Sequence, residues 1–236
     1  MSLVRPTRLT AAAVVAGCAA IALSGAFLIA RYPSLPFILP VHFRRDGMPN
    51  GWQYKTYARV LLPVFVQLAL SITLGMVGAL LLSRPHGSQD EEAPDVRAAA
   101  AAAEGVVLIT LIWIVFQAYV AFALTRLWQS GRAGYGASGL GPVYGYLELV
   151  GVVLTVAVAV RTHMRLGRPA PRPFVAEHWR FGQLYRNPED PALFVPTRNG
   201  SRWTLNFGRP VAAALMALVL AIGVVGPTII LALLLR

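Results

Sequence analysis

Residues 9–30 read LTAAAVVAGCAAIALSGAFLIA and contain no charged side chain. A helix rises about 1.5 Å per residue, so about 20 residues cross a hydrocarbon core that is about 30 Å thick. Three further stretches of similar length are equally free of charge, namely 60–83, 105–125 and 210–235. The sequence therefore predicts a membrane-spanning helix at each of these four positions.

A fifth apolar stretch, 142–160, is also long enough to span, although Glu148 interrupts it. We therefore predict an all-α integral membrane protein, a bundle of five transmembrane helices with a small cytoplasmic β-hairpin between helices 4 and 5. The apolar run of the first span continues through Ala30, so we expect this span to be a retained anchor and not a cleaved signal.

Composition agrees with a membrane location. Of the 236 residues, 56% are apolar and 13% are charged, whereas soluble domains carry about 25% charged residues. This excludes an ordinary soluble enzyme. The net charge is +11, but the basic residues fall between apolar runs and form no continuous patch, so anionic lipid headgroups are better expected partners than nucleic acid.

Basic residues also favour one orientation. With five spans, thirteen Lys and Arg residues fall on the side of the N-terminus and eight on the other side. Cytoplasmic loops carry the excess of basic residues, so we expect a multi-pass protein of the inner (plasma) membrane with its N-terminus in the cytoplasm.

The connecting segments divide the chain into three regions. These are a four-helix membrane region, 1–161, with an ordered outer loop at 31–59 (the first loop), then a basic cytoplasmic loop at 162–209 (the fourth loop), and then a fifth transmembrane helix at 210–236. The fourth loop is a candidate site for a cytoplasmic partner.

Within the fourth loop, Asn199-Gly200 separates two β-prone runs, which is a strong signal for a hairpin. We expect the rings of Phe194, Trp203 and Phe207 to pack this hairpin against the membrane surface.

Acidic residues gather in the second loop, 83–104, where we expect them to be solvated. Asp95 precedes Val96, Arg97 and six alanines. This order is typical of a helix cap, and it predicts a helix that begins in water at Asp95 and continues into the third span.

The first loop carries most of the candidate ligand-binding residues. Three prolines within eight residues prevent a helix and stiffen the backbone, so the loop is expected to be ordered. On this frame the sequence presents the side chains of His42, Arg44, Arg45, Trp52 and Lys55. They suit an anionic or peptide ligand, and they equally suit an interfacial loop whose aromatic rings and arginines meet lipid headgroups.

Glu148 is the one carboxylate inside a predicted span, and such residues face a bundle or a wet cavity by default. Gln67 lies at a similar predicted depth on the same side. One hypothesis is a polar cleft formed by Glu148, Gln67 and Gln117 beneath the first loop. The alternative is a structural glutamate, protonated or paired with arginine, beside Gly141 and Gly145, which let a neighbouring helix approach closely.

Two segments resemble known families. Tyr-Pro-x-Leu-Pro at 32–36, Pro-x-His-Phe at 40–43, Gly-x-Pro at 47–49 and Trp-x-x-Lys at 52–55 resemble a domain of unknown function near the N-terminus of the Sdp-type bacteriocin-immunity membrane proteins of bacteria. The segment 185–210, with Asn-Pro-Glu-Asp-Pro and Trp-Thr-Leu-Asn-Phe, is similar to a second uncharacterised domain of bacterial membrane proteins. The resemblance implies protection against a peptide toxin, and it supplies no catalytic residue.

Three function classes remain after this comparison. The first is a non-enzymatic protein of the immunity or signal-sensing type that recognises a peptide or lipid-like ligand at its outer loop. The alternatives are a small transporter or membrane enzyme that uses Glu148 with His42, and a structural subunit. The four histidines and one cysteine lack the spacing of a metal site, so neither a metal nor a cofactor is expected.

Overall fold

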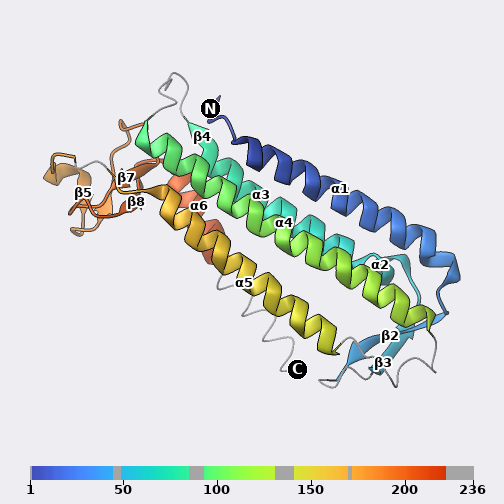
Figure 1. The fold of residues 1–236 in the computed structure, drawn as a ribbon. Helices are drawn as coiled ribbons and strands as arrows, with labels where there is room; N and C mark the ends of the chain where they lie inside the picture. Colours follow the sequence, from blue (N-terminus) through green and yellow to red (C-terminus); the bar gives the residue numbers. More distant parts are fainter. Residues whose placement is uncertain (1, 45–48, 85–92, 131–140, 170–171, 222–236) are drawn as a thin grey trace. The chain divides into compact units, whose positions relative to one another are not determined.

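The computed structural model describes residues 2–44, 49–84, 93–130, 141–169 and 172–221. Most of these residues are helical (Figure 1). The α-helices are α1 (Arg8–Arg31), α2 (Tyr57–Val60), α3 (Leu62–Leu82), α4 (Pro94–Gln129), α5 (Gly141–Leu166) and α6 (Pro210–Leu220). Two 3-10 helices are η1 (Tyr32–Ser34) and η3 (Ala176–His178).

Four helices among the described residues are long and apolar enough to cross a membrane. They are α1, α3, α4 and α5, at the positions of the first four predicted spans. Several such helices are typical of a membrane protein. The predicted fifth span begins as α6, but its remainder, from residue 222, lies outside the described residues, so a bundle of five spans stays a prediction.

Helix α4 is the longest of the four. Its 36 residues correspond to about 54 Å, more than the hydrocarbon core requires. It begins at Pro94, and the backbone N–H groups of Val96 and Arg97 donate to the carbonyl of Ala93. Asp95 therefore lies in the first turn, where its charge suits the helix dipole. The predicted cap at Asp95 was wrong in position because proline, whose φ suits the first turn, begins the helix.

Among the described residues, the strands pair into four antiparallel two-stranded sheets. The pairs are β1 (Ser2–Leu3) with β4 (Ser83–Arg84), β2 (Ile38–Phe43) with β3 (Pro49–Tyr54), β5 (Trp179–Arg180) with β6 (Leu184–Tyr185), and β7 (Phe194–Pro196) with β8 (Trp203–Leu205). The last pair confirms the predicted hairpin around Asn199-Gly200, where Gly200 has a φ of +68°.

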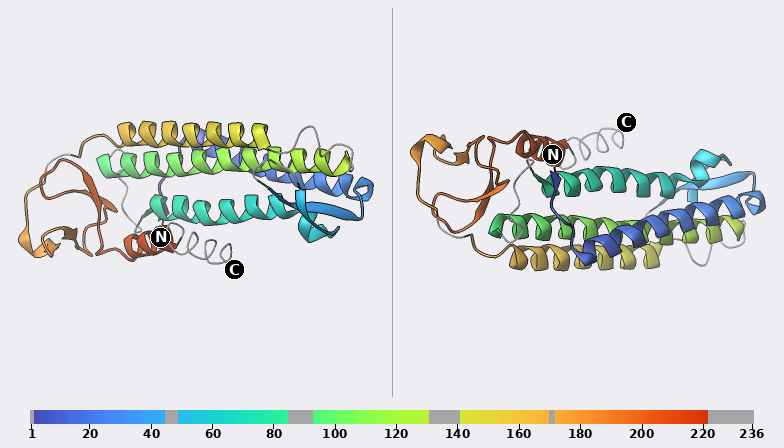
Figure 2. Two further views of the ribbon diagram at one scale, coloured as in Figure 1. Left: turned by 90° about the horizontal axis from the view of Figure 1, so that it is seen from below. Right: turned by 90° about the horizontal axis from the view of Figure 1, so that it is seen from above.

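The chain divides into two compact units. We call residues 11–74 and 107–159 the loop-1 unit, and residues 1–10, 75–106 and 160–236 the loop-4 unit. In the loop-1 unit, the β2–β3 hairpin lies beside the carboxyl-terminal part of α4 in both views of Figure 2.

Each unit has its own hydrophobic core. In the loop-1 unit, buried side chains from α1, the first loop, α2 and α4 pack together: Leu28, Leu35, Leu39, Val60, Ala121 and Trp128. In the loop-4 unit, the core joins α3, α4 and α6 to the fourth loop: Val77, Leu81, Ala103, Leu193, Val211, Ala212 and Leu215.

The aromatic residues in and beside the β7–β8 hairpin form contacts inside the loop-4 unit. Phe194 and Phe207 pack against its core, and the indole Nε1 of Trp203 lies 3.1 Å from the carbonyl oxygens of both Leu166 and Gly167. These contacts occupy one side of each ring, and all three rings are only partly buried, so their packing against the membrane surface stays a prediction.

Asn206 holds the fourth loop in shape. Its side chain is fully buried, and Nδ2 donates to the carbonyls of Asn187 at 2.8 Å and Asp190 at 3.1 Å. Its Oδ1 accepts from the backbone N–H groups of Asn187 at 3.0 Å and Gly208 at 2.9 Å. Nδ2 also lies 3.3 Å from the carbonyl oxygen of Ala192, so one buried amide binds five backbone groups.

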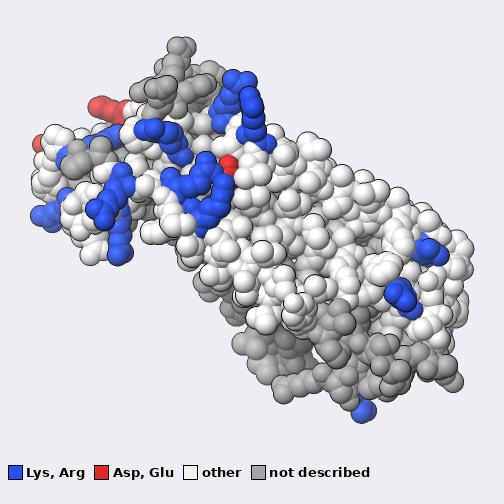
Figure 3. All heavy atoms as spheres, viewed as in Figure 1, with Lys and Arg blue, Asp and Glu red and all other residues white. Residues whose placement is uncertain are grey.

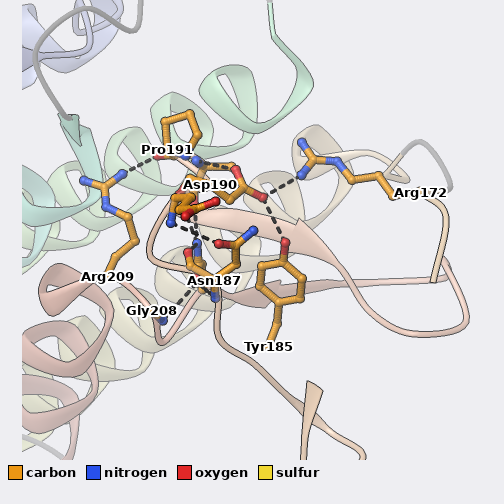
Figure 4. A network of polar contacts seen from close by, with 10 residues as sticks. Arg172, Tyr185, Asn187, Asp190, Pro191, Gly208 and Arg209 are labelled. Atoms are coloured by element: carbon orange, nitrogen blue, oxygen red, sulfur yellow. Dashed lines mark hydrogen bonds and ion pairs between the residues drawn. The ribbon is translucent and has the colours of Figure 1, made fainter. Parts of the chain in front are cut away.

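The Asn-Pro-Glu-Asp-Pro motif supplies the other half of this network (Figure 4). Asp190 Oδ1 accepts from the N–H of Ala192 at 2.9 Å, which fixes a local turn. Position 208 requires glycine, because a Cβ there would collide with the backbone of Asn187.

Replacing Asn206 with alanine should loosen this loop. The change leaves buried backbone groups without partners, and we expect it to destabilise the fourth loop by about 3 kcal/mol. Hydrogen exchange of the full chain in detergent would show faster exchange across 186–209. Asn199→Ala is the matched control: its exposed amide accepts only from Thr197 and Ser201 within its own turn, so exchange should change at that turn alone. Equal effects of the two variants across 186–209 would contradict the role of Asn206.

Candidate functional site

The first loop is built as a hairpin with a bulge. β2 and β3 pair antiparallel with Pro40 opposite Trp52, and the register shifts around His42, which faces Gly51. A Cβ at position 51 would lie 2.9 Å from the Cβ of His42, closer than side chains pack. Glycine at position 51 therefore leaves room for the side chain of His42. Residues 45–48, between β2 and β3, lie outside the described residues.

Lys55 joins the end of the first loop to its beginning, at η1. Its ammonium donates to the carbonyls of Tyr32 at 3.1 Å and Leu35 at 2.8 Å, and it lies 4.8 Å from the centre of the Tyr32 ring. That ring stacks on Tyr57 with the centroids 3.9 Å apart. The one lysine of the sequence thus has a structural role within its own loop.

Helix α4 holds the other side of the hairpin. The indole Nε1 of Trp128 donates to the carbonyl of Pro40 at 3.0 Å, and Gln129 Nε2 donates to the hydroxyl of Ser34 at 2.9 Å. Trp128 is buried in the loop-1 core. The hairpin is consequently fixed to α4 as well as by the pairing of its own strands.

A cavity of about 350 Å³ lies between the first loop, the start of α3 and α4. Its lining is mostly apolar, with four polar or basic side chains: His42, Gln53, Arg59 and Gln117. The apolar lining residues are Val41, Leu62, Pro63, Val66, Val120, Leu124 and Trp128. Among the described residues no carboxylate lines the cavity, so Arg59 makes it electropositive.

Arg59 is positioned by the hairpin. One guanidinium nitrogen, Nη1, donates to the carbonyl of Tyr54 at 2.6 Å, and Thr56 caps the short helix α2 on which Arg59 stands. Sequence reasoning missed Arg59 and Gln53 as site residues. The available signal was their place in the same loop, since Gln53 follows Trp52 directly and Arg59 lies four residues after Lys55.

The structure brings together only two of the predicted site residues at this cavity, His42 and Gln117. The side chains of Arg44 and Trp52 are exposed and do not line it, and Arg45 lies outside the described residues.

Gln67 lies in a helix interface instead. It is fully buried, and its Nε2 donates to Ser24 Oγ at 3.2 Å and to the carbonyl of Ile114 at 2.9 Å. It therefore joins α3 to α1 and α4. Its Oε1 is buried without a hydrogen-bond partner among the described residues.

Glu148 lies on an exposed face of α5 and does not line the cavity. In the part of the chain that the structure describes, it forms no ion pair, and a Cβ at Gly145 would meet only open space. The expectation that glycines let a helix of this chain approach Glu148 was therefore wrong at Gly145, because no described helix covers that face.

A second carboxylate, Glu104, was expected to be solvated, and this expectation was wrong. Its side chain is 2% exposed in the loop-4 unit, and it forms ion pairs with Arg161 at 2.7 Å and with Arg165. The hydroxyl of Thr7 also donates to it. Four residues from the N-terminal segment, α4 and α5 thus form one cluster, which we call the Glu104 cluster.

The neighbouring glycine makes this cluster possible. A Cβ at Gly105 would collide with the side chain of Thr162, the residue that follows Arg161. The sequence carried a signal for the cluster, since a glutamate ends the second loop where arginines begin the fourth, both on the same predicted side.

Two family models match parts of the chain. A domain of unknown function, DUF1648, matches residues 19–66, and a family of unknown function, DUF5808, matches residues 188–212. No curated protein and no solved structure matches the chain. The fold and these matches define a membrane-like protein with two domains of unknown function.

The two matched segments contain the first-loop hairpin and the Asn206 network of the fourth loop. The first match contains the whole hairpin and seven residues of the cavity lining, and the second contains Asn206 and most of its hydrogen-bond network. The resemblance to a domain of unknown function near the N-terminus, followed by a second uncharacterised domain, is confirmed at this level.

Replacing Glu104 with glutamine should destabilise the chain. The substitution keeps the shape but removes the charge that Arg161 and Arg165 share, and we expect a loss of about 2 kcal/mol because both arginines keep some solvent. Thermal unfolding in detergent would show a lower midpoint. Glu148→Gln makes the same chemical change on an exposed face and should leave the midpoint unchanged; equal midpoints for both variants would contradict the role of the cluster.

Proposed function

We propose that this chain is a non-enzymatic multi-pass membrane protein of the immunity or signal-sensing type. Its first loop faces the outside of a bacterial plasma membrane and recognises an apolar peptide that carries a carboxylate. The N-terminus and the basic fourth loop lie in the cytoplasm, where the fourth loop meets lipid headgroups or a protein partner.

The observation that carries the proposal is the cavity beside the first loop. It combines an apolar lining with one arginine and no carboxylate among the described residues. A buried or half-buried arginine binds carboxylates with paired hydrogen bonds, and the apolar walls accept side chains. A peptide terminus or an acidic side chain next to apolar residues satisfies both features.

The polar residues favour a peptide over a lipid. Gln53 and Gln117 each offer an amide donor and acceptor, and His42 adds a ring nitrogen, so the lining matches the alternating N–H and C=O groups of a peptide backbone. A lipid tail is hydrocarbon and forms no hydrogen bonds with these groups. The cavity volume of about 350 Å³ is at the small end of the volumes of ligand sites. It therefore fits a few side chains of a peptide.

Survival of cells would test the proposal. Cells with and without the protein are challenged with a panel of membrane-active peptides, and we expect protection against at least one acidic or free-carboxylate member. Arg59→Gln should abolish this protection, while Arg59→Lys should keep part of it and Arg44→Gln, an exposed arginine away from the cavity, should keep all of it.

Binding to the purified full chain in lipid nanodiscs completes the test. For the protected peptide, we expect Arg59→Gln to weaken binding about tenfold or more, as for the loss of a charge-assisted hydrogen bond. Glu148→Gln should not change it. Equal survival across the panel, equal binding by the arginine variants, or displacement of the peptide by lipid alone would overturn the proposal.

A further inference from the structure

A second cavity, of about 250 Å³, lies within the fourth loop of the loop-4 unit. Four ring-bearing side chains and two arginines dominate its lining: Phe174, His178, Trp179, Tyr185, Arg172 and Arg198. We call it the aromatic pocket. It lies in a different unit from the cavity beside the first loop.

The rings of the aromatic pocket contact one another. Trp179 lies with its ring 6.4 Å from that of Phe174 and 5.4 Å from that of Tyr185, centroid to centroid. The His178 ring is 5.7 Å from Tyr185. None of these residues belongs to the described hydrophobic core of the unit. Their ring surface therefore remains partly open toward the cavity, although burying it in the core would stabilise the fold.

Both charged side chains in the lining of the aromatic pocket are arginines. The guanidinium carbon of Arg198 lies 4.8 Å from the centre of the Phe174 ring, a cation–π contact that holds this cation at the pocket wall. Arg172 is the second cation of the lining, and no carboxylate lines the pocket among the described residues. On the face shown in Figure 3, many Lys and Arg side chains gather over the loop-4 unit, with a few Asp and Glu side chains beside them. A cationic ligand is therefore disfavoured, although aromatic walls alone would accept one.

Asp190 does not line the pocket, but it forms hydrogen bonds with two residues that do. Its Oδ2 accepts from Arg172 Nη1 at 2.9 Å and from the Tyr185 hydroxyl at 3.2 Å, and both side chains converge on it in Figure 4. Burial raises the pKa of Tyr185, so its hydroxyl stays protonated and continues to donate. The positions of the tyrosine ring and of one guanidinium are thereby set before any ligand arrives.

We propose that the aromatic pocket binds a small planar ligand that carries one anionic group, either a carboxylate or a phosphate. The ring of the ligand stacks on Trp179 and Phe174, and its anion pairs with Arg198, whose planar donors match both kinds of anion. The volume of about 250 Å³ is below that of most ligand sites, so it fits one or two fused rings.

Four probes test the proposal on the full chain in zwitterionic nanodiscs by isothermal titration calorimetry. Indole-3-acetate and adenosine monophosphate each join a ring to an anion, tryptamine carries the indole ring with a cation, and acetate is an anion alone. We expect one of the first two to bind, and tryptamine and acetate to bind at least tenfold more weakly. The stronger of the first two identifies carboxylate or phosphate as the anion.

Variants identify the site. Arg198→Gln should weaken binding of the preferred probe about tenfold or more, Arg198→Lys should restore part of it, and Trp179→Phe should weaken it by a smaller factor. Arg186→Gln is the matched control, because Arg186 is exposed in the same loop and does not line the pocket.

Three outcomes would overturn the proposal: tryptamine bound as tightly as indole-3-acetate, equal effects of the Arg198 and Arg186 variants, or no binding of either ring-bearing anion. Circular dichroism and gel filtration of each variant separate loss of the site from loss of folding. Peptide protection should be unaffected by Arg198→Gln, so this test fails or succeeds independently of the proposed function.

Discussion

Hydrocarbon offers no hydrogen bonds to a polypeptide, and this constraint governs the whole chain. An unsatisfied backbone group there costs several kcal/mol, so a segment that crosses must satisfy its own N–H and C=O groups, as a helix does. The four long apolar helices follow from it. The same constraint explains why polar side chains within the helices form hydrogen bonds or ion pairs. Gln67 donates to groups on two other helices, and Glu104 is paired with arginines from α5.

The first loop and the fourth loop both lie outside the long helices, and different contacts stabilise them. Each is a short segment whose strands are too few to be stable alone. The first loop is held by the lysine at its end and by a tryptophan of α4. The fourth loop is held by the buried amide of Asn206 and by an aspartate that fixes its turn. In both regions these contacts leave a cavity with arginine in its lining and no described carboxylate.

Local patterns predicted local structure well. The charge-free stretches placed four helices, and Asn199-Gly200 placed the β7–β8 hairpin, because both depend on residues close together in the sequence. Grouping Gln67 with Glu148 rested on depth alone, and depth says nothing about direction around the helix axis. Gln67 turned out to face two other helices, and Glu148 an open face. Glu104 was assigned to solvent because its partners, Arg161 and Arg165, are more than fifty residues away in the chain.

The sequence by itself determined that this is a membrane-like protein, where most of its helices lie, and which two segments outside them carry recognisable motifs. These properties follow from hydrophobicity and turn chemistry, which act over a few residues. Only the tertiary structure decided which polar side chains meet: His42 with Arg59 and Gln117 at one cavity, the rings with Arg198 at another, and Glu104 with its arginines. Such encounters depend on how distant segments pack, and a single sequence does not record that packing.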